Sequence, residues 1–298
     1  TPAQTEFPPG EWATLGGNEV TNAAGIVDAN EAVRTMIVLG DYHHTDVIVQ
    51  TNVLVDSDHV KVAGGADDVQ GVDAPDGAIV ADGNKVDNIA EFIDNEGLYS
   101  AGTGRFSGLH WNVDTVHGNF YDVKCLVQNN TLSDNDVVVQ ETQSSHYTLV
   151  AGDNEQLNFI DLKDLGQYYD VIIIGGNYYS GNFIYQTNLV LDNDVVKVLA
   201  LGEDGKTSTD QQVVTGQNEL SNEGTITTYG GDEAQPISGN MYDLVAALAN
   251  GATDLEPYTY GWTVPGNGTG VLNVLYIDGD YYDINAIWQI NVISDVDT

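Results

Sequence analysis

Basic residues are scarce in this chain. Its 298 residues include 8 lysines and arginines against 45 aspartates and glutamates, giving a formal net charge of −37 at pH 7. Proteins bind nucleic acids and anionic membrane surfaces mainly through lysine and arginine. The composition therefore excludes both as partners and favours divalent cations or basic surfaces.

Cysteines and long apolar runs are also scarce. The single cysteine, Cys125, excludes an internal disulfide framework, and its strand-like surroundings predict a small core residue. No run approaches the roughly 20 apolar residues of a membrane-spanning helix, so we expect no membrane insertion. The chain opens at Thr1 rather than at methionine, which favours a processed, exported chain.

Catalytic signatures are missing. The chain has no G-x-S-x-G and no H-E-x-x-H motif, and Gly202–Ser208 (GEDGKTS) is too short between its glycines for a phosphate loop. Glycoside cleavage needs two carboxylates at a defined separation, but among 45 acidic residues some pair will always look suitable, so such a pair is no evidence for an enzyme. His43, His44 and Asp46 have metal-binding side chains, but other copies of the repeat described below lack these histidines, so we predict exposed turn residues. We predict that the chain is not an enzyme.

What the chain does contain is a repeated motif. A glutamine follows an aromatic residue after eight positions, and an asparagine, an aliphatic residue and two aspartates then follow at intervals of two. The four copies are Tyr42/Gln50/Asn52/Leu54/Asp56/Asp58, Phe120/Gln128/Asn130/Leu132/Asp134/Asp136, Tyr178/Gln186/Asn188/Val190/Asp192/Asp194 and Tyr281/Gln289/Asn291/Ile293/Asp295/Asp297. They are unevenly spaced, so insertions separate them.

The spacing of the motif predicts a β-strand. Alternate residues of a strand share one face, whereas a helix would scatter the amide and acid positions around its circumference. Valine, isoleucine, threonine and tyrosine, which favour strands, dominate the motif, and the D-x-D end is typical of a turn. Second strands are predicted at Val60–Ala63, Val137–Gln140 and Val195–Leu201. The unit is therefore strand, acidic turn, strand.

The amide positions of the motif predict a structural ladder. Glutamines and asparagines at one strand position can stack in register and share side-chain hydrogen bonds. The alternative is that they only make one sheet face polar. The residues concerned are Gln50, Asn52, Gln128, Asn130, Gln186, Asn188, Gln289 and Asn291.

The acidic turns are candidate Ca²⁺ sites, and Ca²⁺ is the only cofactor predicted. Ca²⁺ takes six to eight oxygen ligands from carboxylates, amides and carbonyls. The candidate ligands are Asp56, Asp58, Asp134, Asp136, Asp192 and Asp194. No turn matches the EF-hand loop or the glycine-rich nonapeptide, so solvated turn aspartates remain the alternative.

The expected fold is mostly β: an irregular β-solenoid or a repeated-hairpin β-sandwich, with one or two short helices. Helical periodicity appears at Asn84–Asn95 and at Tyr242–Ala249. We expect an extended N-terminal arm at 1–14, a β-repeat region at 15–201, and a C-terminal β region at 202–298. The copies span 42–63, 120–140, 178–201 and 281–298, and the boundary is placed at 202–211.

The proline-containing arm is a candidate linker between copies of the chain. An unpaired sheet edge accepts an extended segment by strand addition, and Phe7 and Trp12 are the predicted anchors. Head-to-tail addition of this kind runs on into a fibre. The alternative is that the arm folds back over its own subunit.

The motif Q-x-N-x-[LVI]-x-D-x-D after G-[DN]-[YF]-Y, in an Asp/Asn/Gly-rich acidic chain, resembles bacterial repeat proteins exported by type I secretion, namely RTX-like adhesins and surface-layer-like proteins. The resemblance implies an extracellular or cell-surface location and a cation-assisted structural or adhesive role. We predict a self-associating surface, matrix or filament subunit whose partners are copies of itself. The alternative is a carbohydrate-binding module or a β-helix polysaccharide-active enzyme, with glycans stacked on exposed aromatics such as Trp12, Trp111, Trp262, Tyr258 and Tyr260.

Overall fold

The structure is a computed structural model of the whole chain. The residues it describes are 11–14, 17–29, 35–57, 59–63, 78–80, 84–96, 103–105, 110–134, 147–150, 155–163, 169–199, 211–214, 216–230, 239–252, 255, 263–265 and 271–296. Asp58, Asp136, Phe7, Trp262, Tyr258 and Tyr260, and the predicted strand Val137–Gln140, lie outside them.

The described residues form strands and a single α-helix. The helix is α1 (Gly239–Ala249). The strands are β1 (Glu11–Thr14), β2 (Glu19–Asp28), β3 (Thr35–Val38), β4 (Tyr42–Asp56), β5 (His59–Ala63), β6 (Ala78–Val80), β7 (Lys85–Glu96), β8 (Thr103–Arg105), β9 (His110–Val116), β10 (Phe120–Asp134), β11 (Tyr147–Val150), β12 (Glu155–Lys163), β13 (Val171–Ile174), β14 (Tyr178–Asp192), β15 (Val195–Leu199), β16 (Gln211–Val214), β17 (Glu219–Gly230), β18 (Thr263–Pro265), β19 (Val271–Ile277) and β20 (Tyr281–Asp295). A mostly β fold is confirmed.

One of the two predicted helices is wrong. Apart from Asn84, the segment Asn84–Asn95 lies in β7, which pairs in parallel with β17 over its whole length. Its apolar residues fit a helical period, but Ile89 points outward and is 55% exposed. Pairing along a neighbouring strand outweighs the intrinsic preference of a twelve-residue segment. The other predicted helix, Tyr242–Ala249, lies within α1.

The four copies of the repeat are the four strands of one parallel sheet. The order of the strands is β10-β20-β14-β4, and each motif position is aligned with the same position in its neighbours. This order differs from the order of the copies along the chain. The strand before an acidic turn does not pair with the strand after it: β4 pairs with β14, and β5 with β15.

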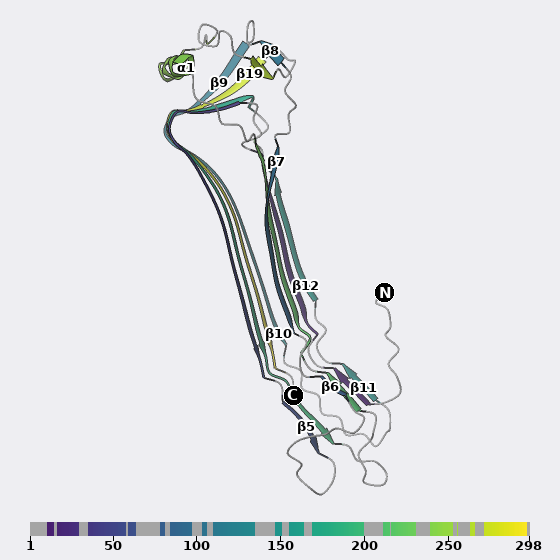
Figure 1. Ribbon diagram of the computed structural model, residues 1–298. Coiled ribbons are helices and arrows are strands. Elements are labelled where there is room, and N and C mark those ends of the chain that lie inside the picture. The colour runs from purple at the N-terminus through teal and green to yellow at the C-terminus, as the bar shows by residue number, and fades with distance from the viewer. Residues whose placement is uncertain are drawn as a thin grey trace.

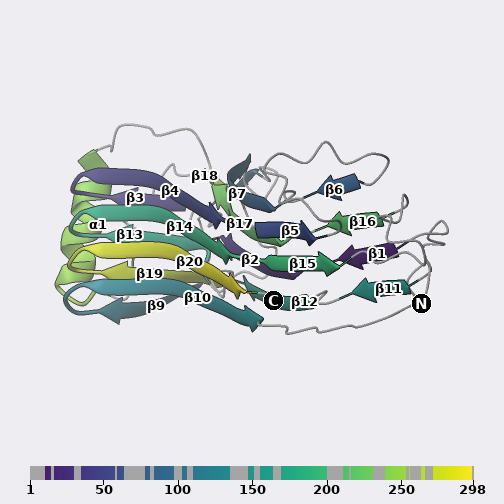
Figure 2. The same cartoon turned by 90° about the horizontal axis from the view of Figure 1, so that it is seen from below.

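A second parallel sheet, β12-β2-β17-β7, faces the repeat sheet. We call the two sheets together the shaft, and a strand from each at the same place in the stack a level. The levels are β4/β7, β14/β17, β20/β2 and β10/β12. Figure 1 shows the two sheets running side by side along the length of the molecule, and Figure 2 shows the levels stacked.

At one end of the shaft the chain bends into what we call the head. The head contains the sheet β3-β13-β19-β9 and the helix α1 (Figure 1). All four residues of β13 are buried, and Val171 and Ile173 pack with Leu244 and Leu248 of α1. Burial of these aliphatic side chains stabilises the head by the hydrophobic effect.

Glycines allow the stacked bends between head and shaft. A Cβ atom on Gly176 would lie 2.7 Å from the carbonyl oxygen of Gly279, and one on Gly40 would lie 2.6 Å from that of Gly176. These distances are too short for any side chain, so the close approach of neighbouring bends explains the glycine of the G-[DN] dipeptide at Gly40, Gly176 and Gly279. Gly118 has open space around it but a positive φ of +93°, which glycine adopts without strain.

The structure describes the end of the predicted arm but almost none of the predicted domain boundary. Trp12 lies in β1, which pairs with β11 and β16 of the same chain, so this end of the predicted arm is a paired strand. The boundary at 202–211 falls almost wholly outside the described residues. Strands from both sides of it pair within the same sheets, for example β17 with β2 and β20 with β14.

Within the described part of the chain, no helix has the length and apolar character needed to span a bilayer.

Candidate functional site

The glutamines of the repeat form a hydrogen-bonded row through the shaft. The Nε2 of Gln50 donates to the Oε1 of Gln186 at 2.9 Å, and Gln186 donates in the same way to Gln289 at 2.9 Å. Gln289 donates to Gln128 at 2.8 Å. Three of these glutamines also donate to backbone carbonyls of the facing sheet: Gln186 to Ile89, Gln289 to Glu223 and Gln128 to Ala23. The row therefore joins the levels and also the two sheets.

The asparagines form a zigzag with a second row from the facing sheet. The rows are Asn52, Asn188, Asn291 and Asn130 in the repeat sheet, and Asn88, Asn222, Asn22 and Asn158 in the other. In the interior, the Nδ2 of Asn222 donates to the Oδ1 of Asn188 at 2.8 Å, and the Oδ1 of Asn222 accepts from Asn291 at 3.1 Å. Asn222, Asn188 and Asn291 are fully buried. This is a polar core whose amides satisfy one another.

The second row was missed in the sequence, although a signal for it exists. The pattern Asn-x-x-x-Asn occurs at Asn18/Asn22, Asn84/Asn88, Asn154/Asn158 and Asn218/Asn222. Its second asparagine enters the zigzag. Its first asparagine, where described, meets the aspartates of the repeat: Asn84 donates to Asp192 at 2.8 Å, and Asn18 donates to Asp295 at 2.9 Å.

The first aspartates of the D-x-D turns form another row, in the order Asp56, Asp192, Asp295, Asp134. Asp56 is at the exposed end of the row, whereas Asp192, Asp295 and Asp134 are buried. The second aspartate is described only in the third copy, where Asp194 is buried and its Oδ2 accepts a hydrogen bond from the amide of Gly216 at 3.3 Å.

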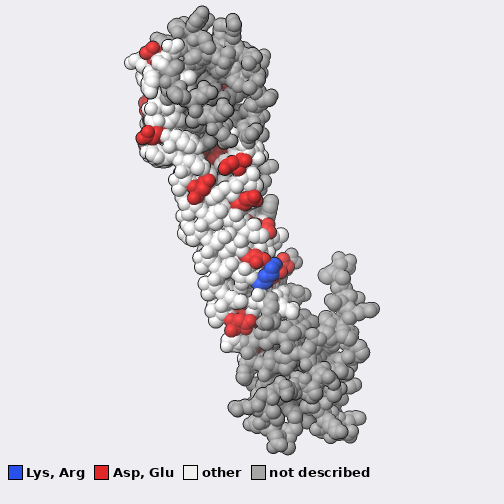
Figure 3. Space-filling view, in the orientation of Figure 1, with Lys and Arg blue, Asp and Glu red and all other residues white. Residues whose placement is uncertain are grey.

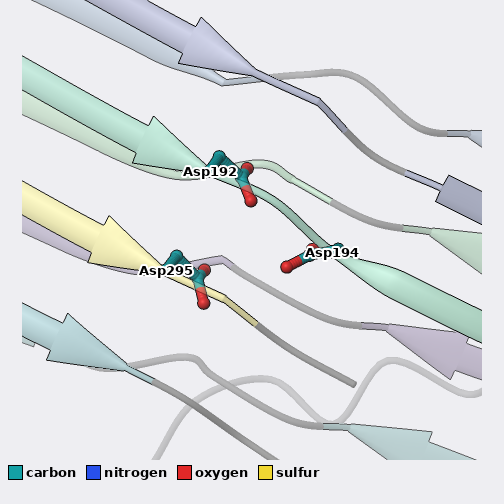
Figure 4. A group of neighbouring side chains, drawn as sticks. All are labelled: Asp192, Asp194 and Asp295. Atoms are coloured by element: carbon teal, nitrogen blue, oxygen red, sulfur yellow. The ribbon is translucent and has the colours of Figure 1, made fainter.

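The structure brings Asp192, Asp194 and Asp295 together as a candidate metal centre. One carboxylate oxygen from each lies within 4.8 Å of the others, and all three residues are buried. Figure 4 shows Asp192 and Asp295 at the ends of neighbouring strands, with Asp194 on the segment that follows. Two of the three were predicted ligands. Asp295 was in the motif but was not predicted as a ligand.

Three buried carboxylates at this separation repel one another strongly in a low-dielectric interior. Asparagine amides offset part of this charge: Asn218 donates to Asp192 at 3.0 Å, beside the bonds from Asn84 and Asn18. Carboxylate and amide oxygens are the ligands that Ca²⁺ takes in proteins. The cluster therefore has the ligand chemistry of a hard-cation site.

The other candidate ligands that the structure describes, and the two histidines, do not belong to this cluster. Asp56 and Asp134 lie at the two ends of the aspartate row, so they join no group of three carboxylates among the described residues. His43 and His44 lie in strand β4 and not in a turn, which corrects the prediction. His43 stacks on Tyr179 with ring centroids 4.7 Å apart, while the Nε2 of His44 lies 3.0 Å from Asp46, so the two rings do not converge.

A pocket of about 200 Å³ lies where the shaft meets the head. Its lining residues include Asp28, Asp94, His44, Tyr42 and Tyr229. The ring of His44 also lies 3.2 Å from the hydroxyl oxygen of Ser180. The pocket offers carboxylates and aromatic rings to a polar ligand.

The outward face of the repeat sheet carries an aromatic row and the cysteine. The rings of Tyr121, Tyr282, Tyr179 and His43 stack at 4.7–4.8 Å, nearly parallel. Cys125 is exposed on this face, so its prediction as a core residue is wrong. It lies at an outward position of β10, on the opposite face from the buried Leu126. Trp111 is half-buried against the core under α1 rather than exposed.

Acidic side chains are spread along the described part of the face shown in Figure 3, and basic side chains occupy a small area. Comparison of the chain with models of protein families, with curated proteins and with solved structures found no match in any of the three.

Proposed function

We propose that this protein is an extracellular structural subunit that associates with copies of itself into a surface, matrix or filament assembly, with cations assisting the assembly. The proposed architecture is an irregular β-solenoid in which each level adds one copy of the repeat. Export fits the resemblance to type I secreted repeat proteins, and the scarcity of basic residues fits a role that does not involve nucleic acids.

The observation that carries the proposal is the incomplete end of the stack. Ile48 and Leu54 of β4 occupy inward positions that are fully buried in the interior levels, yet they are 41% and 47% exposed. An uncovered sheet edge with apolar side chains is a template for another chain. A second copy of the same repeat has the complementary pattern of strands.

Cation assistance follows from charge. At −37 per chain, two copies repel each other, and this repulsion falls as salt screens it. The cluster Asp192, Asp194 and Asp295 supplies three buried carboxylates for a divalent cation near the end of the shaft. A bound cation lowers the net charge and removes the repulsion within the cluster.

Negative-stain electron microscopy and sedimentation velocity on the purified protein test the proposal. With millimolar Ca²⁺ we expect elongated assemblies with one repeat distance, and with a chelator at low salt we expect mostly single copies. A protein that stays a single copy at every Ca²⁺ and salt concentration would refute self-association.

The variant Asp194→Asn tests the cation site separately. Without Ca²⁺ it is expected to melt at a higher temperature than the wild type, because one of three buried like charges is removed. For the wild type, Ca²⁺ at 100 times its dissociation constant is expected to add about 2.7 kcal/mol of stability, and Asp194→Asn should lose this gain. Asp41→Asn, at an exposed position, is the matched control and should keep it. Equal responses of all three proteins to Ca²⁺ would place the cation elsewhere.

The pocket supports one alternative function, binding or cleavage of a polysaccharide. Tyr42 and Tyr229 offer rings for a sugar, and Asp28 and Asp94 offer carboxylates. Turnover on a panel of polysaccharides that disappears in Asp94→Asn would favour this alternative. Without turnover or binding, the structural role stands.

A further inference from the structure

The two ends of the stack of levels present different surfaces. At one end, β4 is the outermost strand, and its inward residues Gln50 and Asn52 are exposed. At the other end, Gln128 and Asn130 of β10 are buried, 3% and 1% exposed, and they donate to the carbonyls of Ala23 and Thr21 in the facing sheet. There Asn158 of β12 ends the zigzag. The two ends of the stack are therefore different surfaces, as a heterologous contact between copies requires.

The hydrogen bonds of the amide rows have a direction that matches the two ends. Along the glutamine row each Nε2 donates away from β4, so the row begins with the acceptor oxygen of Gln50 and ends with the amide of Gln128. Among the described residues, nothing donates to the Oε1 of Gln50. A copy placed with its β4 against β10 would put that acceptor beside the donor Gln128.

The asparagine zigzag runs in the opposite direction and matches in the same arrangement. Each Nδ2 donates towards β4, from Asn158 to Asn22 and from Asn188 to Asn52. Within the described part of the chain, the Oδ1 of Asn158 receives no donor, whereas Asn52 donates only to the carbonyl of Val86 at 3.3 Å. In the same stacking, the amide of Asn52 in the next copy meets the acceptor of Asn158.

Charges at the register positions of the two edge strands are also complementary. Continuing the alignment of β10, β20, β14 and β4 by one more copy places Lys124 beside Asp46 of the next copy. The same alignment places Asp122 beside His44 of that copy. Within the chain, the Nζ of Lys124 already lies 3.2 Å from Asp122, so these charges are grouped at the edge.

We propose that copies of this chain stack on one another edge to edge. In this joint, β10 of one copy pairs in parallel and in motif register with β4 of the next, and β12 lies beside β7 of the next. The inference rests on the proposed self-association and specifies its joint. The joint adds a continuous glutamine row, a continuous asparagine zigzag and a stack of Tyr121 on His43, and it buries Ile48 and Leu54. It does not use the N-terminal segment, whose strand β1 pairs within its own chain.

The joint also contains an unfavourable contact, which explains the need for cations. Asp134 would stand beside Asp56 of the next copy, two carboxylates about 4.8 Å apart across adjacent strands. Like charges directly opposite each other destabilise strand pairing. The joint is therefore expected to tighten with rising salt or with divalent cations.

The native Cys125 allows a direct test by one substitution. In the proposed register Cys125 stands beside Val47 of the next copy, and both face outward. Neighbouring strands place such Cα atoms about 4.8 Å apart, within disulfide range. Inside one chain these positions are at opposite edges of the sheet, three strand spacings or about 14 Å apart, so no internal disulfide can form.

The experiment is oxidation of Val47→Cys in Ca²⁺, followed by non-reducing electrophoresis. We expect a ladder of covalent multimers that disappears in the double variant with Cys125→Ser. The matched control Val49→Cys lies on the same face of the same strand, but about 8 Å from the partner's Cys125 in this register, so it should give at least about tenfold less product.

A second measurement uses charge in place of a disulfide. Ile48→Lys places a charge inside the joint and should abolish assembly, while Val49→Lys keeps its charge in solvent and should preserve assembly. Assemblies that form normally but crosslink equally, or not at all, in both cysteine variants would overturn this joint and leave the proposed function standing. A wild-type protein that never assembles would overturn both.

Discussion

The head and the shaft are built from parallel strands of the same chain, but their cores differ. In the head, the four residues Val171–Ile174 are all buried against aliphatic neighbours and α1. In the shaft, β14 points both apolar and polar residues inward, and the polar Gln186, Asn188 and Asp192 are at most 1% exposed. The core of the head is apolar, whereas the core of the shaft combines apolar clusters, such as Ile184 with Ile226 and Ile287, with rows of buried, hydrogen-bonded amides.

The difference shows what each kind of core specifies. Aliphatic side chains pack in many ways, so the run Val-Ile-Ile-Ile by itself does not fix which neighbours β13 takes. Amide rows tolerate no shift: moving β14 by two residues against β20 would set Asn188 beside Gln289 and leave buried amides unpaired. The shaft therefore fixes the register, and the head adds stability at one end.

The largest effect is expected from breaking the polar core. Asn222→Leu removes the bonds of Asn222 to Asn88, Asn188 and Asn22, and leaves buried partners unsatisfied. We expect a loss of about 4 kcal/mol in the free energy of unfolding, measured by urea denaturation. Asn222→Gln should lose nearly as much, because the longer side chain displaces the amide.

The matched control is Asn52→Leu at the exposed end of the same zigzag, where water replaces the lost bonds. Its loss is expected to be about 1 kcal/mol. Equal losses for Asn222→Leu and Asn52→Leu would mean that the interior amides contribute no more to the stability of the shaft than the exposed ones.

Substitutions in the apolar core of the head are expected to lower the free energy of unfolding by less, and a conservative substitution there should be tolerated. Ile173→Ala, at a fully buried position, should cost about 3 kcal/mol through lost burial and a cavity. Ile173→Val should cost only about 1 kcal/mol. Calorimetry on both variants checks this gradation, and a cost for Ile173→Val equal to that of Ile173→Ala would show that the head also depends on exact geometry.

The smallest effect is expected at the bend between the two regions. The pKa of the Asp278 carboxyl lies below its ordinary value of 3.8, because the carboxyl accepts hydrogen bonds from the amide of Gly118 and from the ring of His117. A depressed pKa stabilises the folded state above pH 3.8, and this stability is lost as the pH falls through the folded pKa.

Urea midpoints of the wild type and Asp278→Asn, compared from pH 7 into acid, measure this contribution. The wild type should be slightly more stable at pH 7, and the difference should vanish once Asp278 is protonated. A difference that stays constant down to pH 2 would attribute it to something other than the charge of Asp278.

Much of the repeat was predictable because its signal is local. The two-residue spacing of Gln186, Asn188 and Asp192 indicates a strand in any context. The helical period at Asn84–Asn95 misled for the opposite reason: its apolar residues fit a helix locally, and only pairing with β17 makes the segment a strand. Asp295 was missed as a ligand because its neighbours Asp192 and Asp194 come from a distant part of the chain.

The sequence by itself determined that the chain is a mostly β protein with an acidic surface and four equivalent strands, since strand period, charge and repetition are properties of residues and their spacing. Only the tertiary structure decided the order of the strands, β10-β20-β14-β4, the facing asparagine row and the exposed position of Cys125. The physical reason is equivalence. Copies with the same motif offer one another the same hydrogen bonds, so the sequence of one strand does not state which copy lies beside it.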